Sequence, residues 1–331
     1  SKKVLENIES VGENYRIKMT QAGRCPFLNN QNLCDIYIRI SPEAMFPVCQ
    51  TYPRKIKRYY DMTIITLYVS CPEVCQMLLE KSEYISWGYA EDDQIPEIIS
   101  PDWQLYNALI NGMILSNKVV ADTGLSIRQK SYLLLRMAEL MQQKIESGNL
   151  ASIRQSMQDI QKGNYEKYLQ EYEVDRLKTG RWESLYDILE TMNKIISLDE
   201  EDKNMLQCFH IIKRTENEKY ERYKEKYCET ENQVQYTNLM LTYLLQYYMD
   251  SLNGVSLVKN ILKALLTLIF FQTYEMLEHY RKGALTEARK VTFISRLARI
   301  VENSNGIDVM ADQLIENNKQ QELYQLIGFI M

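Results

Sequence analysis

Histidine and phosphate-binding glycine motifs are the clearest shortages in this sequence. The chain has 331 residues and 2 histidines, His210 and His279, so a histidine-rich metal site is impossible and a Ser/His/Asp triad has little material. The sequence contains no G-x-G-x-x-G motif and no P-loop, so a nucleotide-binding βαβ unit would lack its phosphate cradle. These absences argue against dinucleotide-binding enzymes, P-loop enzymes and triad hydrolases.

Glycine and proline are also scarce, with 12 and 7 residues, which excludes collagen-like chains and disfavours disorder and a turn-rich all-β fold. The prolines are unevenly placed: six lie within residues 21–100, the seventh is Pro101, and none follows. We therefore predict a mainly α protein with two domains, a Cys/Pro-rich putative metal or Fe–S module at 1–100 and an all-α helical domain at 101–331. The N-terminal module is expected to contain short strands or irregular structure.

The charge balance limits the classes of partner that the chain can attract. The sequence has 39 basic and 44 acidic residues and a formal net charge of −5, so it has no general attraction to nucleic acid or anionic lipid. The most apolar segment, Val255–Leu277, carries Lys259, Lys263 and Glu275, which favours a central core helix over a membrane span. We expect neither nucleic acid nor a membrane as a partner.

The N-terminus shows no targeting pattern. The first twenty residues are polar and charged, without the apolar stretch of a signal peptide. We therefore expect a cytoplasmic protein with reduced thiols, and no disulfide framework for its 7 cysteines.

Local patterns predict the secondary structure. Alternating or β-branched residues favour strands at Asp35–Ile40 and Met62–Val69. Helical spacing and capping residues predict a longer series of helices, at Trp103–Val120, 126–147, 151–163, 182–196, 199–228, Val234–Leu252, Val255–Tyr280 and Thr286–Asn303, with a last pair of short helices after Gly306.

The cysteines form the one chemical constellation in the sequence. Cys25 and Cys71 are each followed by proline, and Cys34 and Cys49 lie between them. Proline fixes the backbone φ beside a thiolate ligand, and thiolates bind zinc or iron–sulfur clusters. Paired C-x₂₋₄-C knuckles are missing, so buried or partly paired thiols remain open as an alternative.

The motifs around these cysteines carry a resemblance. Gly23-Arg24-Cys25-Pro26-Phe27-Leu28, Leu33-Cys34-Asp35-Ile36-Tyr37, Cys49-Gln50-Thr51-Tyr52-Pro53-Arg54 and Ser70-Cys71-Pro72-Glu73 together resemble the flagellin lysine-N-methylase family (FliB-type). Later segments are similar too, at Glu231-Asn232, Ser295-Arg296 and Glu302-Asn303-Ser304.

This resemblance implies an S-adenosylmethionine-dependent methylase that acts on lysine side chains of flagellin and is associated with an iron–sulfur cluster. Cys25, Cys34, Cys49 and Cys71 stand at the family's cysteine positions and are the metal ligands that it implies, for a 4Fe–4S cluster or zinc. The family also carries a cysteine group upstream of the C-P-F-L motif that the printed sequence does not include, so we expect the site to be empty or partial here.

Methyl transfer to lysine needs a neutral amine and a cationic donor held in line with it. Aromatic faces stabilise such cations, and the 24 tyrosines, many at helical spacing, could supply them. The catalytic residue and the donor pocket stay unassigned. Two alternatives remain open: a non-catalytic helical protein-binding scaffold with a structural metal knot, and a redox sensor that uses Cys71 and Cys75.

Overall fold

The chain folds into two compact units, which we call the N-terminal unit (residues 1–52) and the C-terminal unit (residues 53–331). The computed structural model describes residues 2–11, 14–21, 24–88, 90, 102–176, 230–282, 286–303, 305–316, 324 and 327. The domain boundary predicted near residue 100 falls at the edge of the gap at 91–101 and stays a prediction. The helices predicted at 182–196 and 199–228 also lie outside the described residues.

The N-terminal unit is built from short elements with little apolar core. It contains α1 (Lys2–Glu6), β1 (Ile8–Val11), β2 (Asn14–Ile17), α2 (Asp35–Arg39), the 3₁₀ helix η1 (Pro42–Ala44) and α3 (Pro47–Thr51). The strands form an antiparallel hairpin. Among its described residues, Phe27 and Ile36 are the buried apolar side chains, so hydrophobic burial contributes little to the stability of this unit.

The strand predicted at Asp35–Ile40 is wrong, because this segment forms helix α2. Cys34 occupies the N-cap position in an extended conformation, where a hydrogen bond from Asp35 N–H to Phe27 O (2.8 Å) ties the turn to the preceding loop. Asp35 then lies in the first helical turn, where the helix dipole favours a carboxylate. Arg39 Nε pairs with its side chain at 3.1 Å, one turn on. These local interactions outweigh the alternating pattern.

The C-terminal unit begins with a hairpin and a short helix. Strands β3 (Arg54–Tyr59) and β4 (Met62–Leu67) pair antiparallel from Arg54 opposite Leu67 to Tyr59 opposite Met62. This confirms the strand predicted at Met62–Val69. Helix α4 (Pro72–Leu79) follows, with Cys71 at its N-cap and Pro72 at its first position.

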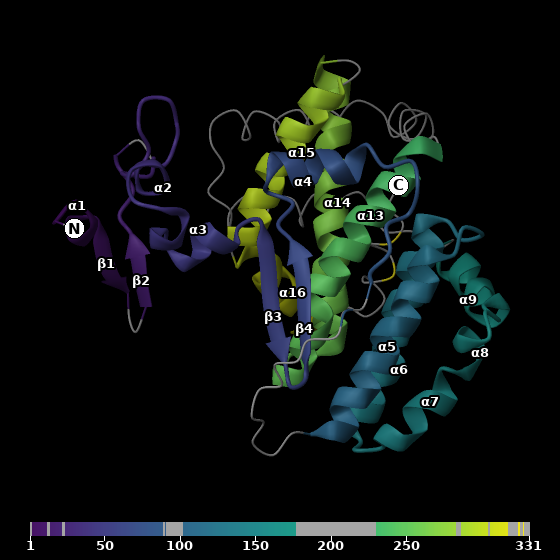
Figure 1. The fold of residues 1–331 in the computed structure, drawn as a ribbon. Coiled ribbons are helices and arrows are strands. Elements are labelled where there is room, and N and C mark those ends of the chain that lie inside the picture. The colour runs from purple at the N-terminus through teal and green to yellow at the C-terminus, as the bar shows by residue number, and fades with distance from the viewer. Residues whose placement is uncertain are drawn as a thin grey trace. The chain divides into compact units, whose positions relative to one another are not determined.

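The helical body of the C-terminal unit confirms the mainly α prediction (Figure 1). Ser126 and Gln129 form a capping box at the start of the second long helix, and Gly148 follows its end at a positive φ of 67°. The elements are α5 (Trp103–Ala121), α6 (Ile127–Glu146), η2 (Leu150–Ser152), α7 (Ile153–Ser156), α8 (Gln158–Gln161), α9 (Glu166–Arg176), α13 (Thr230–Tyr247), η3 (Tyr248–Asn253), α14 (Leu257–Lys282), α15 (Glu287–Asn303) and α16 (Gly306–Glu316).

One predicted helix is broken. The segment 151–163 forms η2, α7 and α8 in succession, with an interruption at Met157 (φ −100°, ψ 6°). The Ser152 and Ser156 hydroxyls donate to the backbone oxygens of Asn149 and Ser152. Such local bonds compete with the helical pattern.

Helix α14 is the centre of the core. It packs against α6, α13, α15 and α16. Within the described residues, Leu257–Glu275 of this helix is long and apolar enough to cross a membrane, and 89% of its apolar window is buried inside the protein. The segment predicted as a central core helix is therefore confirmed as one.

Candidate functional site

Three of the four predicted cysteine ligands lie in the N-terminal unit. Cys25 and Cys34 flank a loop that an isolated bridge between Leu28 and Cys34 closes. Cys49 lies in α3. The ring of Phe27, from the loop, packs against that of Phe46, just before α3, with centroids 5.7 Å apart. This aromatic contact brings the loop and the helix together.

The three thiols share one electrostatic neighbourhood. Partial burial raises the pKa of the Cys49 thiol, and the nearby Cys25 and Cys34 raise it further. A bound cation would reverse this effect, because it favours thiolates. In the part of the chain that the structure describes, however, no three Cys, His, Asp or Glu side chains lie close enough together to hold a metal ion.

Cys71, the fourth predicted ligand, lies in the C-terminal unit, and the C-terminal end of α15 holds the turn before it. The Glu302 carboxylate accepts hydrogen bonds from the backbone N–H of Val69 (2.9 Å) and of Ser70 (3.2 Å). It also accepts one from the hydroxyl of Tyr243 on α13, at 3.1 Å. Burial raises the pKa of Glu302, and these hydrogen bonds oppose that rise. The S-C-P-E and E-N segments, far apart in the sequence, therefore meet at one carboxylate.

Cys75 is poorly suited to redox chemistry. Its side chain is fully buried, and burial raises the pKa of the thiol to about 12. Its sulfur lies 3.7 Å from the backbone oxygen of Val291. Since the thiolate is the reactive form of cysteine, this environment disfavours the redox-sensor alternative.

A lysine lies against two tyrosine rings beside the Glu302 carboxylate. Lys55 Nζ, on β3, lies 5.4 Å from the ring centroids of both Tyr68 and Tyr247, and donates to Gln246 Oε1 at 3.1 Å. Burial lowers the pKa of Lys55 to about 8, with a further contribution from Lys57. We call Lys55, Tyr68, Gln246 and Tyr247 the tyrosine–lysine cluster.

Two ion pairs lie next to this cluster. Lys263 Nζ lies 4.3 Å from the centroid of the Tyr247 ring and pairs with Asp308 at 2.8 Å. Lys57 Nζ contacts both carboxylate oxygens of Asp250 at 2.7 Å. The basic run that the sequence places at 54–58 thus directs two lysines toward acceptors of the helical body. These tyrosine faces therefore hold amines, and burial favours the neutral form of Lys55.

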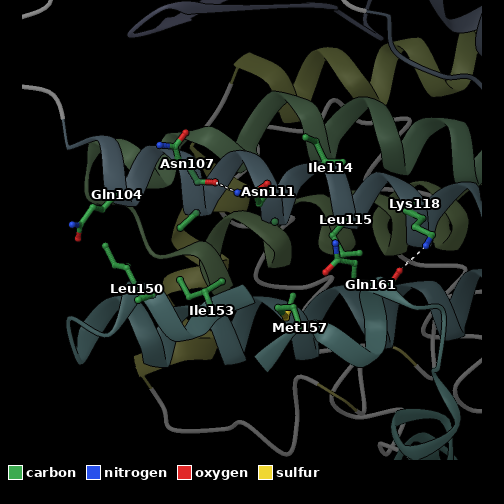
Figure 2. A pocket seen from close by; sticks show the side chains of 13 residues that line it. Gln104, Asn107, Asn111, Ile114, Leu115, Lys118, Leu150, Ile153, Met157 and Gln161 are labelled. Carbon is green, nitrogen blue, oxygen red and sulfur yellow. Dashed lines mark hydrogen bonds between the residues drawn. The ribbon is translucent and has the colours of Figure 1, made fainter. Parts of the chain in front are cut away.

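An open groove runs between α5 and the segment 150–161, with a volume of about 770 Å³. Figure 2 shows Leu150, Ile153 and Met157 directed from that segment toward α5. The opposite wall carries carboxamides and apolar side chains of α5, and at one end Lys118 Nζ donates to Gln161 O at 2.7 Å. Sequence analysis missed this groove, because exposed carboxamides on a helix resemble an ordinary solvated face.

Comparison with known proteins places the chain in a family. Residues 114–329 match the model of the FliB lysine N-methylase C-terminal domain. The chain belongs to the FliB lysine N-methylase family. It is also similar to the flagellar biosynthetic protein FliU of Salmonella muenchen, with 29% identity over 73 residues, which are 22% of this chain and 43% of that protein. The match therefore spans less than half the length of that relative. No solved structure matches the chain.

The family match covers part of the tyrosine–lysine cluster and none of the predicted cysteine ligands. Gln246, Tyr247 and Glu302 lie within residues 114–329, whereas Lys55, Tyr68 and the predicted cysteine ligands precede it. The expected membership, which rested mainly on the cysteine motifs, is thus confirmed through the opposite end of the chain.

Proposed function

We propose that this protein is an S-adenosylmethionine-dependent lysine N-methylase that acts on lysine side chains of flagellin in the cytoplasm. The match to the FliB lysine N-methylase C-terminal domain over residues 114–329 carries this proposal. The similarity to a flagellar biosynthetic protein supports the flagellar context.

The tyrosine–lysine cluster supports the chemistry. Bound S-adenosylmethionine would supply an electrophilic methyl group on a cationic sulfur. The faces of Tyr68 and Tyr247 suit cations, because aromatic rings attract sulfonium and ammonium groups. Burial at this position favours the neutral amine, as it lowers the pKa of Lys55. The residues present thus fit the cationic donor and the neutral amine of a methyl transfer, and Glu302 and Gln246 supply oxygen acceptors beside them.

The test is a methylation assay. The full chain is incubated with flagellin and S-adenosylmethionine, and flagellin peptides are examined by mass spectrometry for methyl additions on lysine. Unmodified lysines after prolonged incubation would contradict the proposed activity. Tyr247→Leu is expected to lower the rate strongly, because it removes an aromatic face, whereas Tyr247→Phe keeps the ring and most of the rate.

We also propose that Cys25, Cys34, Cys49 and Cys71 hold zinc or a 4Fe–4S cluster. Two observations support this: three of the thiols share a neighbourhood in the N-terminal unit, and that unit has few buried apolar side chains among its described residues. Small units of this kind are commonly stabilised by a metal. The described residues form no closed ligand sphere for it.

Metal analysis of the full chain tests this second proposal. We expect Cys71→Ser to lower the bound metal or cluster content, and Cys75→Ala, one turn further along α4, to leave it unchanged. Equal metal content in wild type and Cys71→Ser would remove Cys71 from the ligand set.

The same observations favour one alternative function, a non-catalytic helical scaffold with a structural metal. Calorimetry with S-adenosylhomocysteine separates the two functions. Bound zinc without any binding of S-adenosylhomocysteine would favour the scaffold.

A further inference from the structure

The groove along α5 has a repeating wall of carboxamides. Gln104, Asn107 and Asn111 lie at positions i, i+3 and i+7 of the helix, and all three line the groove. Residues at this spacing share one helix face. Among the described residues, the side chains of Gln104 and Asn107 have no hydrogen-bond partner, and Asn111 donates from Nδ2 to Asn107 O at 2.8 Å. These amides are therefore available to an occupant.

The facing wall is apolar and the groove has little charge. Leu150, Ile153 and Met157 line the segment opposite α5, again at the spacing i, i+3 and i+7. No described carboxylate lines the groove, and its one described cation, Lys118, is held by Gln161 O at the end. A phosphate or a cationic ligand would find no free opposite charge, so these walls favour a neutral occupant.

A peptide main chain has the matching chemistry. A carboxamide donates through its NH₂ and accepts through its oxygen, so one Asn or Gln can pair with both the N–H and the C=O of one residue in an extended chain, which lie on the same edge of that chain. An extended chain also turns alternate side chains to opposite faces, which allows every second one to contact the apolar wall.

The length of the groove sets the size of the segment. Gln104 and Lys118 are fourteen positions apart on α5, which at 1.5 Å per residue is about 21 Å. An extended chain rises about 3.3 Å per residue, so the groove takes roughly six residues. Its volume of about 770 Å³ lies in the range of clefts that bind their ligands closely.

We propose that this groove binds an extended segment of the protein substrate, about six residues long, through its main chain and with little dependence on sequence. The inference rests on the proposed function only in taking the substrate to be a protein. Such a groove would hold the substrate chain while a lysine elsewhere in that chain is modified.

The binding test uses the full chain and a fluorescein-labelled hexapeptide of alternating leucine and serine, followed by fluorescence anisotropy. A second peptide carries N-methyl groups on alternate backbone nitrogens, which removes main-chain donors. We expect roughly tenfold weaker binding of the N-methylated peptide, and of the unmodified peptide to the double variant Asn107→Leu/Asn111→Leu. The exposed Gln158 lies on α8 and does not line the groove, so Gln158→Leu is the matched control and should bind like wild type.

Three results would overturn the inference: no binding of the unmodified peptide, equal binding of both peptides, or wild-type binding by the double variant. Thermal unfolding of each variant checks that the fold is kept.

Flagellin kinetics separate this inference from the proposed function. The double variant should raise KM for flagellin roughly tenfold while kcat stays near wild type. Methylation with an unchanged KM would refute the groove and leave the methylase proposal standing. Peptide binding as expected, without any methylation of flagellin by wild type, would support the groove and refute the methylase proposal.

Discussion

Lys130 on α6 allows a sharp test of the energetics of this fold. Its side chain is fully buried, and its Nζ has no hydrogen-bond acceptor among the described residues. The amine lies 4.2 Å from the centroid of the Tyr84 ring. Burial lowers the pKa of Lys130 to about 8, although the charge of Asp122 acts in the opposite direction. We predict that Lys130→Met increases the free energy of unfolding.

The magnitude follows from the pKa. A fall from 10.5 to about 8, at about 1.4 kcal/mol for each pKa unit, gives an upper limit of roughly 3 kcal/mol for the cost of keeping the ammonium in this site at neutral pH. Methionine has a similar length and no charge, and loses only the contact with Tyr84. We expect Lys130→Met to be more stable than wild type by ~1–3 kcal/mol at pH 7.

The pH dependence has a definite sign. Between pH 8 and pH 10.5 the unfolded chain keeps the Lys130 proton that the folded chain has lost, so this group makes wild type more stable as the pH rises. Below pH 8 both states are protonated, so the cost of the buried ammonium is fully present and no longer changes with pH. The difference between Lys130→Met and wild type should therefore shrink from pH 7 to pH 10.

Urea unfolding followed by circular dichroism at several pH values measures these differences. Lys290→Met is the control, because Lys290 is also buried but pairs with the buried Glu275 at 3.0 Å. Lys290→Met leaves Glu275 without its cation and should lower the free energy of unfolding by about 3–5 kcal/mol. A clear loss of stability in Lys130→Met, or a difference from wild type that does not change with pH, would refute the reasoning.

Three further predictions concern single positions. Glu302→Ala should lower the free energy of unfolding by roughly 2–3 kcal/mol, because it leaves two backbone N–H groups and a hydroxyl without their acceptor, and Glu302→Gln should cost less in the same urea titration. Gly112→Ala would place a Cβ in steric conflict with Tyr248 Oη and with Met141 Sδ, so we expect a lower melting temperature and partial recovery on adding Tyr248→Phe. Competitive acetylation of the full chain should give a midpoint for Lys55 near pH 8, and a midpoint near 10.5 would show that its amine is solvated.

The helical body could be predicted because its signals are local. Ser126 caps a helix through a side chain that reaches only three residues along the chain, and Gly148 ends it at a backbone angle that glycine favours. The prediction at Asp35–Ile40 was wrong because an alternating pattern over six residues also fits a short helix with one buried side chain, Ile36. Tertiary contacts and capping decide between the two.

The candidate sites were harder to predict from the sequence than the helices. The cysteine motifs stand out because each occupies a few consecutive residues, yet their shared neighbourhood depends on a contact between the rings of Phe27 and Phe46 that no spacing reveals. The tyrosine–lysine cluster joins Lys55 to Gln246, which lie 191 positions apart. Apolar residues that repeat with a period of 2 or 3.6 indicate which face of a strand or helix is buried. They do not indicate which distant element packs against that face.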